Sequence, residues 1–127
     1  MRDHASNPVR VLLVDDNVDF LAGVADWLRT DSRWDLVGTA CCGTDALAEA
    51  ERLRPDVVLL DATMPDLSGF EVTRRMKAGP DAPHVVVLTL QDSQVVRDEA
   101  AAAGAEGFVA KSAVTERLFD VITEVLK

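Results

Sequence analysis

Five short apolar runs, separated by segments with helical spacing, are the feature that most constrains the fold of this chain. The runs are rich in valine and leucine, and most of them are continuous rather than alternating. They cover Val9–Val14, Asp35–Ala40, Val57–Leu60, Val85–Leu90 and Gly107–Ala110. Continuous runs are typical of strands buried on both faces, as in a parallel sheet. Because right-handed crossovers place helices on both faces, this alternation predicts a doubly wound α/β fold with five strands and five helices.

The segments between the runs have the boundary residues of helices. Apolar residues recur there at intervals of three and four, which predicts amphipathic helices. Ser68 and Glu71 have the spacing of a capping box at the start of the third helix. Gly104 is a stop signal for the fourth helix, and Ser112 is placed to cap the fifth.

The length of 127 residues suits one domain, which we expect over residues 9–127 after a flexible tail over residues 1–8. Hydrophobic residues account for 48% of the chain and charged residues for 28%. This average mixture excludes a disordered chain, a collagen-like repeat and a disulfide scaffold. The two cysteines, Cys41 and Cys42, are adjacent and lack metal-ligand spacing, which favours reduced thiols.

The charge of the chain is strongly acidic. Its 22 Asp and Glu residues outnumber 13 Lys and Arg residues, for a formal net charge of −9. Such a chain repels phosphate backbones and anionic membranes, so we expect no direct binding to nucleic acid or to a membrane. No apolar run approaches the roughly 20 residues of a membrane span, and the polar first residues do not resemble a signal peptide. We therefore predict a cytoplasmic protein.

Polar side chains stand at the ends of four of the five predicted strands. Asp15 and Asp16 follow the first strand, and Asp61 follows the third. Thr89 ends the fourth strand and Lys111 follows the fifth. Ligands of open α/β sheets bind outside the carboxyl ends of the strands, so we expect these groups to meet at one edge. Each residue alone would be an ordinary turn, strand or surface residue, and only their conjunction indicates a site.

The chemistry of this set suits a phosphoryl group and a hard cation. Clustered carboxylates repel one another unless a cation lies between them, and Mg²⁺ prefers oxygen ligands that include one or two carboxylates and a phosphate oxygen. Lys111 and the Thr89 hydroxyl would neutralise and orient the phosphoryl group. Asp61, the central carboxylate, is the natural nucleophile and would form an acyl phosphate.

Four stretches, taken in their order and spacing, resemble one known family. They are VLLVDDN at 11–17, DVVLLDATMPDLSGFEV at 56–72, VVVLTL at 85–90 and GAEGFVAKS at 104–112. The chain resembles a receiver domain of bacterial two-component response regulators, from about residue 9 to residue 126. The resemblance implies a flavodoxin-like fold with strand order 2-1-3-4-5.

The resemblance also implies a metal site. Asp61 matches the phosphorylated aspartate of the family, and Asp15 and Asp16 match its acidic pair. Asp16 resembles the family's direct Mg²⁺ ligand, and Asp15 resembles the residue that acts on the metal mostly through water. Thr63 matches the residue whose backbone carbonyl completes the metal site.

The same resemblance implies a switch and a partner. Thr89 and Lys111 match the switch hydroxyl and the phosphate-binding lysine, and Phe108 matches the aromatic switch position, here without a hydroxyl. A histidine kinase or a histidine phosphotransfer protein would donate the phosphoryl group, and the face formed by the fourth helix, fifth strand and fifth helix would change its affinity for partners. Weak self-phosphorylation and dephosphorylation are implied, and a homodimer is left open.

Two positions depart from the commonest pattern of the family. Leu90 follows Thr89 where small residues are usual, which puts the access of small phosphodonors and the rate of hydrolysis in doubt. Ser112 follows Lys111 where proline is usual in much of the family. Serine at this position, in the context GFVAKS, resembles the receivers that are attached to helix-turn-helix DNA-binding output domains. No such domain lies within these residues, so the chain is either a single-domain regulator or, as we favour, the receiver of a longer protein.

Three alternatives stay open from the sequence. A degenerate receiver would act only as an interaction module, and Leu90 is the one feature that favours it. A small Mg²⁺-dependent phosphohydrolase of the haloacid-dehalogenase kind would need a second acid where this chain has Thr63. A nucleotide- or flavin-binding domain would need a glycine-rich first loop, whereas this chain has acidic residues there.

Overall fold

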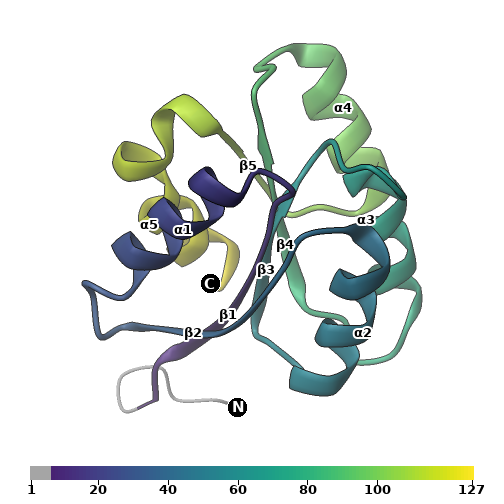
Figure 1. Cartoon of the computed structure of the whole chain (residues 1–127). Coiled ribbons are helices and arrows are strands. Elements are labelled where there is room, and N and C mark those ends of the chain that lie inside the picture. Colours follow the sequence, from purple (N-terminus) through teal and green to yellow (C-terminus); the bar gives the residue numbers. More distant parts are fainter. Residues whose placement is uncertain (1–6) are drawn as a thin grey trace.

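The computed structural model describes residues 7–127, so most of the tail predicted over residues 1–8 lies outside the described part. A five-stranded sheet forms the middle layer, and helices cover both of its faces (Figure 1). The elements are β1 (Val9–Val14), α1 (Val18–Leu28), β2 (Trp34–Ala40), α2 (Gly43–Leu53), β3 (Val57–Asp61), α3 (Gly69–Ala78), β4 (His84–Thr89), α4 (Gln94–Ala103), β5 (Gly107–Ala110), the 3-10 turn η1 (Lys111–Ala113) and α5 (Val114–Val125).

All strand pairs of the sheet are parallel, in the order β2-β1-β3-β4-β5. This confirms the predicted fold class. The strand order reverses between β1 and β3, because the chain passes from β1 to one side of the sheet and then returns to the other. Val14 pairs with Leu60 and Asp61 pairs with Leu88, so the carboxyl ends of the three central strands lie level with one another. The crevice beside such a reversal is where open α/β sheets bind ligands.

The core is divided into two halves by the sheet. One half lies under α1 and α5 and includes Leu13, Leu59 and Leu118. The other lies under α2, α3 and α4 and includes Leu60 and Val72. Every residue of β3 is buried, because successive side chains point to opposite faces and both faces are covered. This explains the continuous apolar runs in the sequence.

Helix α5 is attached to α1 and β2 by an aromatic stack. The ring of Phe119 lies 4.1 Å from the ring of Trp27, with an angle of 7° between the ring planes. The ring of Trp34 lies 5.0 Å from Phe119 on a similar plane. Stacked rings of this kind add to the hydrophobic stabilisation of the helix contact.

Most of the predicted boundaries agree with the structure, and one does not. The Ser68 hydroxyl caps α3 by accepting from the Glu71 amide at 3.1 Å, and Gly104 ends α4 in the left-handed conformation with φ of 105°. The prediction that Ser112 caps the fifth helix is wrong. Ser112 lies inside the 3-10 turn, and α5 begins only at Val114. The extra turn after β5 makes Ala113 the N-cap residue and so shifts the start of the helix by one residue.

The amino edge of the sheet carries a compact charged cluster around Glu106. One carboxylate oxygen of Glu106 lies 2.6 Å from Nζ of Lys77 and 2.7 Å from Nδ1 of His84. The other accepts from the Val85 amide at 3.0 Å. Burial raises the pKa of Glu106, but the hydrogen bonds from Lys77, Val85 and His84 outweigh burial and leave this pKa below its ordinary value. The cluster ties α3, β4 and the loop before β5 together.

None of the helices within residues 7–127 has the length and apolar character that crossing a bilayer requires.

Candidate functional site

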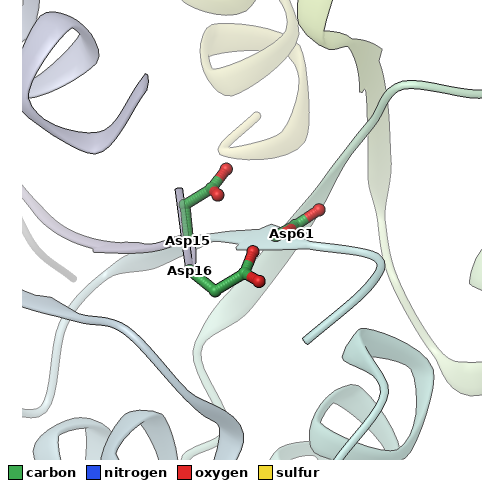
Figure 2. Close-up of side chains that lie close together, drawn as sticks. All are labelled: Asp15, Asp16 and Asp61. Atoms are coloured by element: carbon green, nitrogen blue, oxygen red, sulfur yellow. The ribbon is translucent and has the colours of Figure 1, made fainter. Parts of the chain in front are cut away.

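Three carboxylates predicted from separate parts of the sequence lie together at the carboxyl edge of the sheet. Asp15 and Asp16 follow β1, and Asp61 ends β3 (Figure 2). One carboxylate oxygen from each lies within 4.8 Å of the others. Asp15 is fully buried and Asp61 is only 5% exposed, whereas Asp16 is exposed to solvent. The cluster is therefore rooted in the core and open on one side.

Lys111 brings a positive charge into this cluster. Its Nζ lies 2.7 Å from Oδ2 of Asp15 and 3.3 Å from Oδ1 of Asp61, and its side chain is only 9% exposed. The ammonium group also lies 4.7 Å from the ring centroid of Phe20 on α1. One lysine thus bridges two buried carboxylates, and the three carboxylates together leave the cluster with a net negative charge.

The ionisation of Asp61 reflects this crowding. Burial and the negative charge of Asp15 raise the pKa of Asp61 to about 6, although Lys111 and the Thr63 amide act in the opposite direction. At neutral pH the carboxylate is mostly ionised, but its negative charge is poorly compensated. A nearby cation, or a reaction that neutralises the carboxylate, would stabilise a group in this environment.

Backbone contacts fix the two buried carboxylates. Oδ1 of Asp15 accepts from the Asn17 amide at 2.8 Å, and Asn17 in turn caps α1. Oδ1 of Asp61 accepts from the Thr63 amide at 3.3 Å. Gly69 packs against the end of β3 so closely that a Cβ there would collide with the carbonyl oxygen of Asp61. The start of α3 is therefore pressed against the strand end that carries Asp61.

Thr89 lies at the same edge but is bonded to its own loop. It pairs with Ala110, next to Lys111, and it is 4% exposed. Its hydroxyl accepts from the Gln91 amide at 3.0 Å and lies 3.2 Å from the Gln91 carbonyl oxygen. The hydroxyl thus holds the backbone of the loop between β4 and α4, rather than contacting Asp61.

Phe108 lies further from the carboxylates, on β5. Its side chain is half-buried, and the guanidinium of Arg97 on α4 lies 4.6 Å from the ring centroid. Arg97 also forms an ion pair of 2.7 Å with Asp92, in the loop that follows β4. The ring is therefore in contact with α4 and indirectly with the loop that Thr89 holds.

Leu90 stands at the rim of the site. It is 85% exposed and lines a shallow groove of about 290 Å³ together with Asn17, Phe20, Lys111 and Ser112. Its side chain points into solvent at the mouth of the site rather than filling the space beside Asp61.

The donor set fits a hard divalent cation. All three side chains offer carboxylate oxygens, which are the ligands that Mg²⁺ prefers, and the exposed Asp16 leaves room for water and for a phosphate oxygen. The excess of negative charge beside a single lysine is the condition that a cation would relieve.

Asp66 is a residue of this edge that sequence reasoning missed. It lies in the loop between β3 and α3, and its carboxylate accepts from the amides of Gly43 and Thr44 at the start of α2, at 2.7 and 2.9 Å. Sequence patterns of helix capping are local, whereas Thr44 and Asp66 are 22 positions apart. No signal in a single sequence pairs them.

Comparison with known proteins finds one family. The response regulator receiver domain matches residues 11–123. The chain is 35% identical over 117 residues to the response regulator GacA of Pseudomonas aeruginosa, which covers 92% of this chain and 55% of that protein. It is 33% identical over 117 residues to the response regulator protein VraR of Staphylococcus saprophyticus, which covers 91% of this chain and 55% of that protein. The chain thus spans about half the length of these relatives.

A solved structure shows the same fold. The signal receiver domain of the putative response regulator NarL from Mycobacterium tuberculosis aligns with a TM-score of 0.87 and 30% identity. The alignment covers 94% of this chain and 97% of that one. The fold predicted from strand and helix alternation is therefore shared with a receiver domain over nearly its full length.

Proposed function

The chain belongs to the response regulator receiver domain family, and from this we propose that it is a switch that accepts a phosphoryl group on Asp61. The single observation that carries the proposal is the cluster of three carboxylates with one buried lysine at the reversal of strand order. Family membership also disfavours a phosphohydrolase and a nucleotide-binding domain. The folded receiver would span residues 9–127.

In the proposed reaction, Asp61 is the nucleophile. One of its carboxylate oxygens forms a bond to phosphorus while the bond between phosphorus and the donor nitrogen breaks, and a phosphohistidine donor leaves as histidine. Lys111, which lies 3.3 Å from Oδ1 of Asp61, orients and neutralises the phosphoryl oxygens. The closed packing around Asp15 and Asp61 keeps both groups in place before the donor arrives.

We propose that Asp15, Asp16 and Asp61 would hold Mg²⁺, together with the backbone carbonyl of Thr63. The bound ion would supply positive charge for the carboxylates and for the oxygens of the phosphoryl group. The exposed position of Asp16 and the oxygen-only donor set support this assignment.

The phosphorylated form would act through Thr89 and Phe108. The Thr89 hydroxyl would exchange its contacts with Gln91 for a phosphoryl oxygen, and the loop after β4 would follow. Phe108 would then move relative to Arg97, which changes the face formed by α4, β5 and α5. This face would have two conformations, and phosphorylation would shift the equilibrium between them only as far as the phosphoryl group stabilises one conformation more than the other.

The partners of this chain are part of the same proposal. A histidine kinase or a histidine phosphotransfer protein would be the donor. The aligned residues make up only 55% of each of these two relatives, so we propose that the output is a DNA-binding domain outside these residues or a separate partner protein. A homodimer of the phosphorylated form would be one way to signal.

The decisive test is the mass of the intact protein after incubation with Mg²⁺ and acetyl phosphate. One phosphoryl group should add about 80 Da, and the gain should be absent from Asp61→Asn and after chelation of Mg²⁺. Labelling that persists in Asp61→Asn would refute the assignment of the acceptor. A wild-type protein that gains no mass from acetyl phosphate or from a phosphohistidine donor would point instead to a receiver that works as an interaction module.

A further inference from the structure

Helix α2 is capped from a distant part of the chain. Within residues 7–127, its own N-cap residue, Cys42, provides no side-chain cap for the backbone amides of the first turn, and its Sγ lies only 3.5 Å from the Thr44 hydroxyl. The Asp66 carboxylate takes this place, because it accepts from the Gly43 amide at 2.7 Å, from the Thr44 amide at 2.9 Å and from the Thr44 hydroxyl at 2.9 Å. It also accepts from the amide of Leu67 at 2.8 Å. One carboxylate thus binds two segments together.

The contact between these segments is close and charged. The amides of Thr44 and Gly43 hold the pKa of Asp66 well below its usual range, so the carboxylate stays ionised at the positive end of α2. A Cβ on Gly43 would lie 2.8 Å from Cβ of Leu67 and 3.2 Å from Oδ1 of Asp66. Glycine at this position lets the loop approach the helix.

The loop that Asp66 holds begins at the proposed phosphorylation site. It runs over residues 62–68, from the end of β3 to the start of α3. Its far end is fixed, because the Gly69 amide donates to the carbonyl of Ala62 at 2.9 Å. Between these points lies Thr63, which is exposed and whose amide makes a long contact of 3.3 Å with Asp61. The hydrogen bonds from the first turn of α2 to the Asp66 carboxylate hold the loop on the other side of Thr63.

We propose that Asp66 is a positioning residue for the metal and phosphoryl site, because its carboxylate ties the loop that carries Thr63 to the first turn of α2. This inference rests on the proposed function. Groups that orient metal ligands without touching the metal commonly matter for affinity almost as much as the ligands do. Asp66 would therefore set the place of the Thr63 backbone relative to Asp61.

A simpler role must be separated from this one, namely that Asp66 only stabilises α2 as a helix cap. Cys42→Ser distinguishes the two roles, because the extended backbone of Cys42 (φ −153°, ψ 168°) suits a serine N-cap. In the double variant Asp66→Ala/Cys42→Ser, α2 regains a local cap while the loop stays untied. Ser93→Ala is the matched control, since it removes the side-chain cap of α4 without touching the loop.

The experiment measures urea unfolding midpoints and Mg²⁺ titrations followed by the amide signals of Asp61 and Thr63. We expect Asp66→Ala to lower the midpoint and to weaken Mg²⁺ binding roughly tenfold. The double variant should regain most of the midpoint, but neither the Mg²⁺ affinity nor the wild-type Thr63 amide shift. Ser93→Ala should lower the midpoint and keep the Mg²⁺ affinity. Asp66→Asn, which retains one acceptor oxygen, should lie between wild type and Asp66→Ala.

The inference is overturned if the double variant regains full Mg²⁺ affinity, or if Asp66→Ala leaves both the Thr63 amide shift and Mg²⁺ binding unchanged. Failure of the proposed function looks different, because the wild-type protein would then show no Mg²⁺-dependent shifts at Asp61. Even in that case, the Thr63 amide shift in the metal-free double variant decides whether Asp66 holds the loop.

Discussion

The two edges of the sheet are built from the same kinds of side chain in opposite proportions. At the carboxyl edge one lysine, Lys111, pairs with two members of a cluster of three carboxylates. At the amino edge one glutamate, Glu106, is surrounded by a lysine, a histidine and a backbone amide. The pKa of Asp61 is accordingly raised to about 6, while that of Glu106 lies below its ordinary value.

The difference shows how a charged cluster becomes a site. The Glu106 carboxylate is saturated, because each of its oxygens accepts from at least one donor. The carboxyl edge is left with an excess of negative charge at a place where solvent can enter beside Asp16. Unsatisfied charge costs stability, and it is retained where a ligand or a reaction makes use of it.

The largest expected effect is a loss of Mg²⁺ affinity at the carboxyl edge. Asp16→Ala should weaken Mg²⁺ binding by roughly a hundredfold, because loss of even an outer partner of a metal typically costs 10- to 100-fold. Calorimetric titration with MgCl₂ measures this. Asp19→Ala removes an exposed carboxylate from the first turn of α1 and should leave the titration unchanged. Equal losses in both variants would mean that Mg²⁺ responds only to overall charge.

A second prediction concerns how pH changes Mg²⁺ affinity and stability at the carboxyl edge. Below the pKa of Asp61, about 6, a proton competes with the cation, so the apparent Mg²⁺ affinity should fall by up to about tenfold for each pH unit. The folded-state pKa of Asp61 is above its ordinary value, so the metal-free protein should gain stability from this group as the pH falls from about 7 to about 5. Unfolding midpoints across this range measure the gain, and Asp61→Asn should abolish it.

The smallest effect is expected at the amino edge. Glu106→Gln should lower the free energy of unfolding by about 1 kcal/mol, a modest value because the group is partly exposed and screened by solvent. The pKa of Glu106 is lowered by folding, so its stabilisation is present above its ordinary pKa of 4.5 and is lost as the pH falls further. Urea unfolding at pH 7 and pH 4 measures both. Any loss of Mg²⁺ affinity in Glu106→Gln would contradict the separation of the two edges.

The fold was predictable because its signals are local and repeated. Every residue of β3 is buried, and its sequence reads as an uninterrupted apolar run that ends in Asp61. The place of Asp15, Asp61 and Lys111 followed from the rule that parallel strands end at one edge. The rule does not predict the distances from Lys111 to Asp15 and Asp61, because these distances depend on how the chain turns after β5.

The missed features arise where a strand ends or where distant segments make contact. Ser112 has the composition of a helix cap, but the 3-10 turn after β5 puts it one residue too early. Asp66 reads as an ordinary loop residue until α2 is brought beside it. Leu90 continues the apolar run of β4 in sequence, yet it is 85% exposed, because the strand ends at Thr89.

The division of the core into two halves has a consequence for synthesis on the ribosome. The half under α2, α3 and α4 has all of its helices once Ala103 has emerged. The other half requires α5, whose Leu118 and Ile122 are fully buried and whose Phe119 completes the aromatic stack. Until these residues leave the exit tunnel, one face of the nascent sheet is covered by α1 alone. Stalled chains that end before α5 should therefore be the ones that chaperones engage.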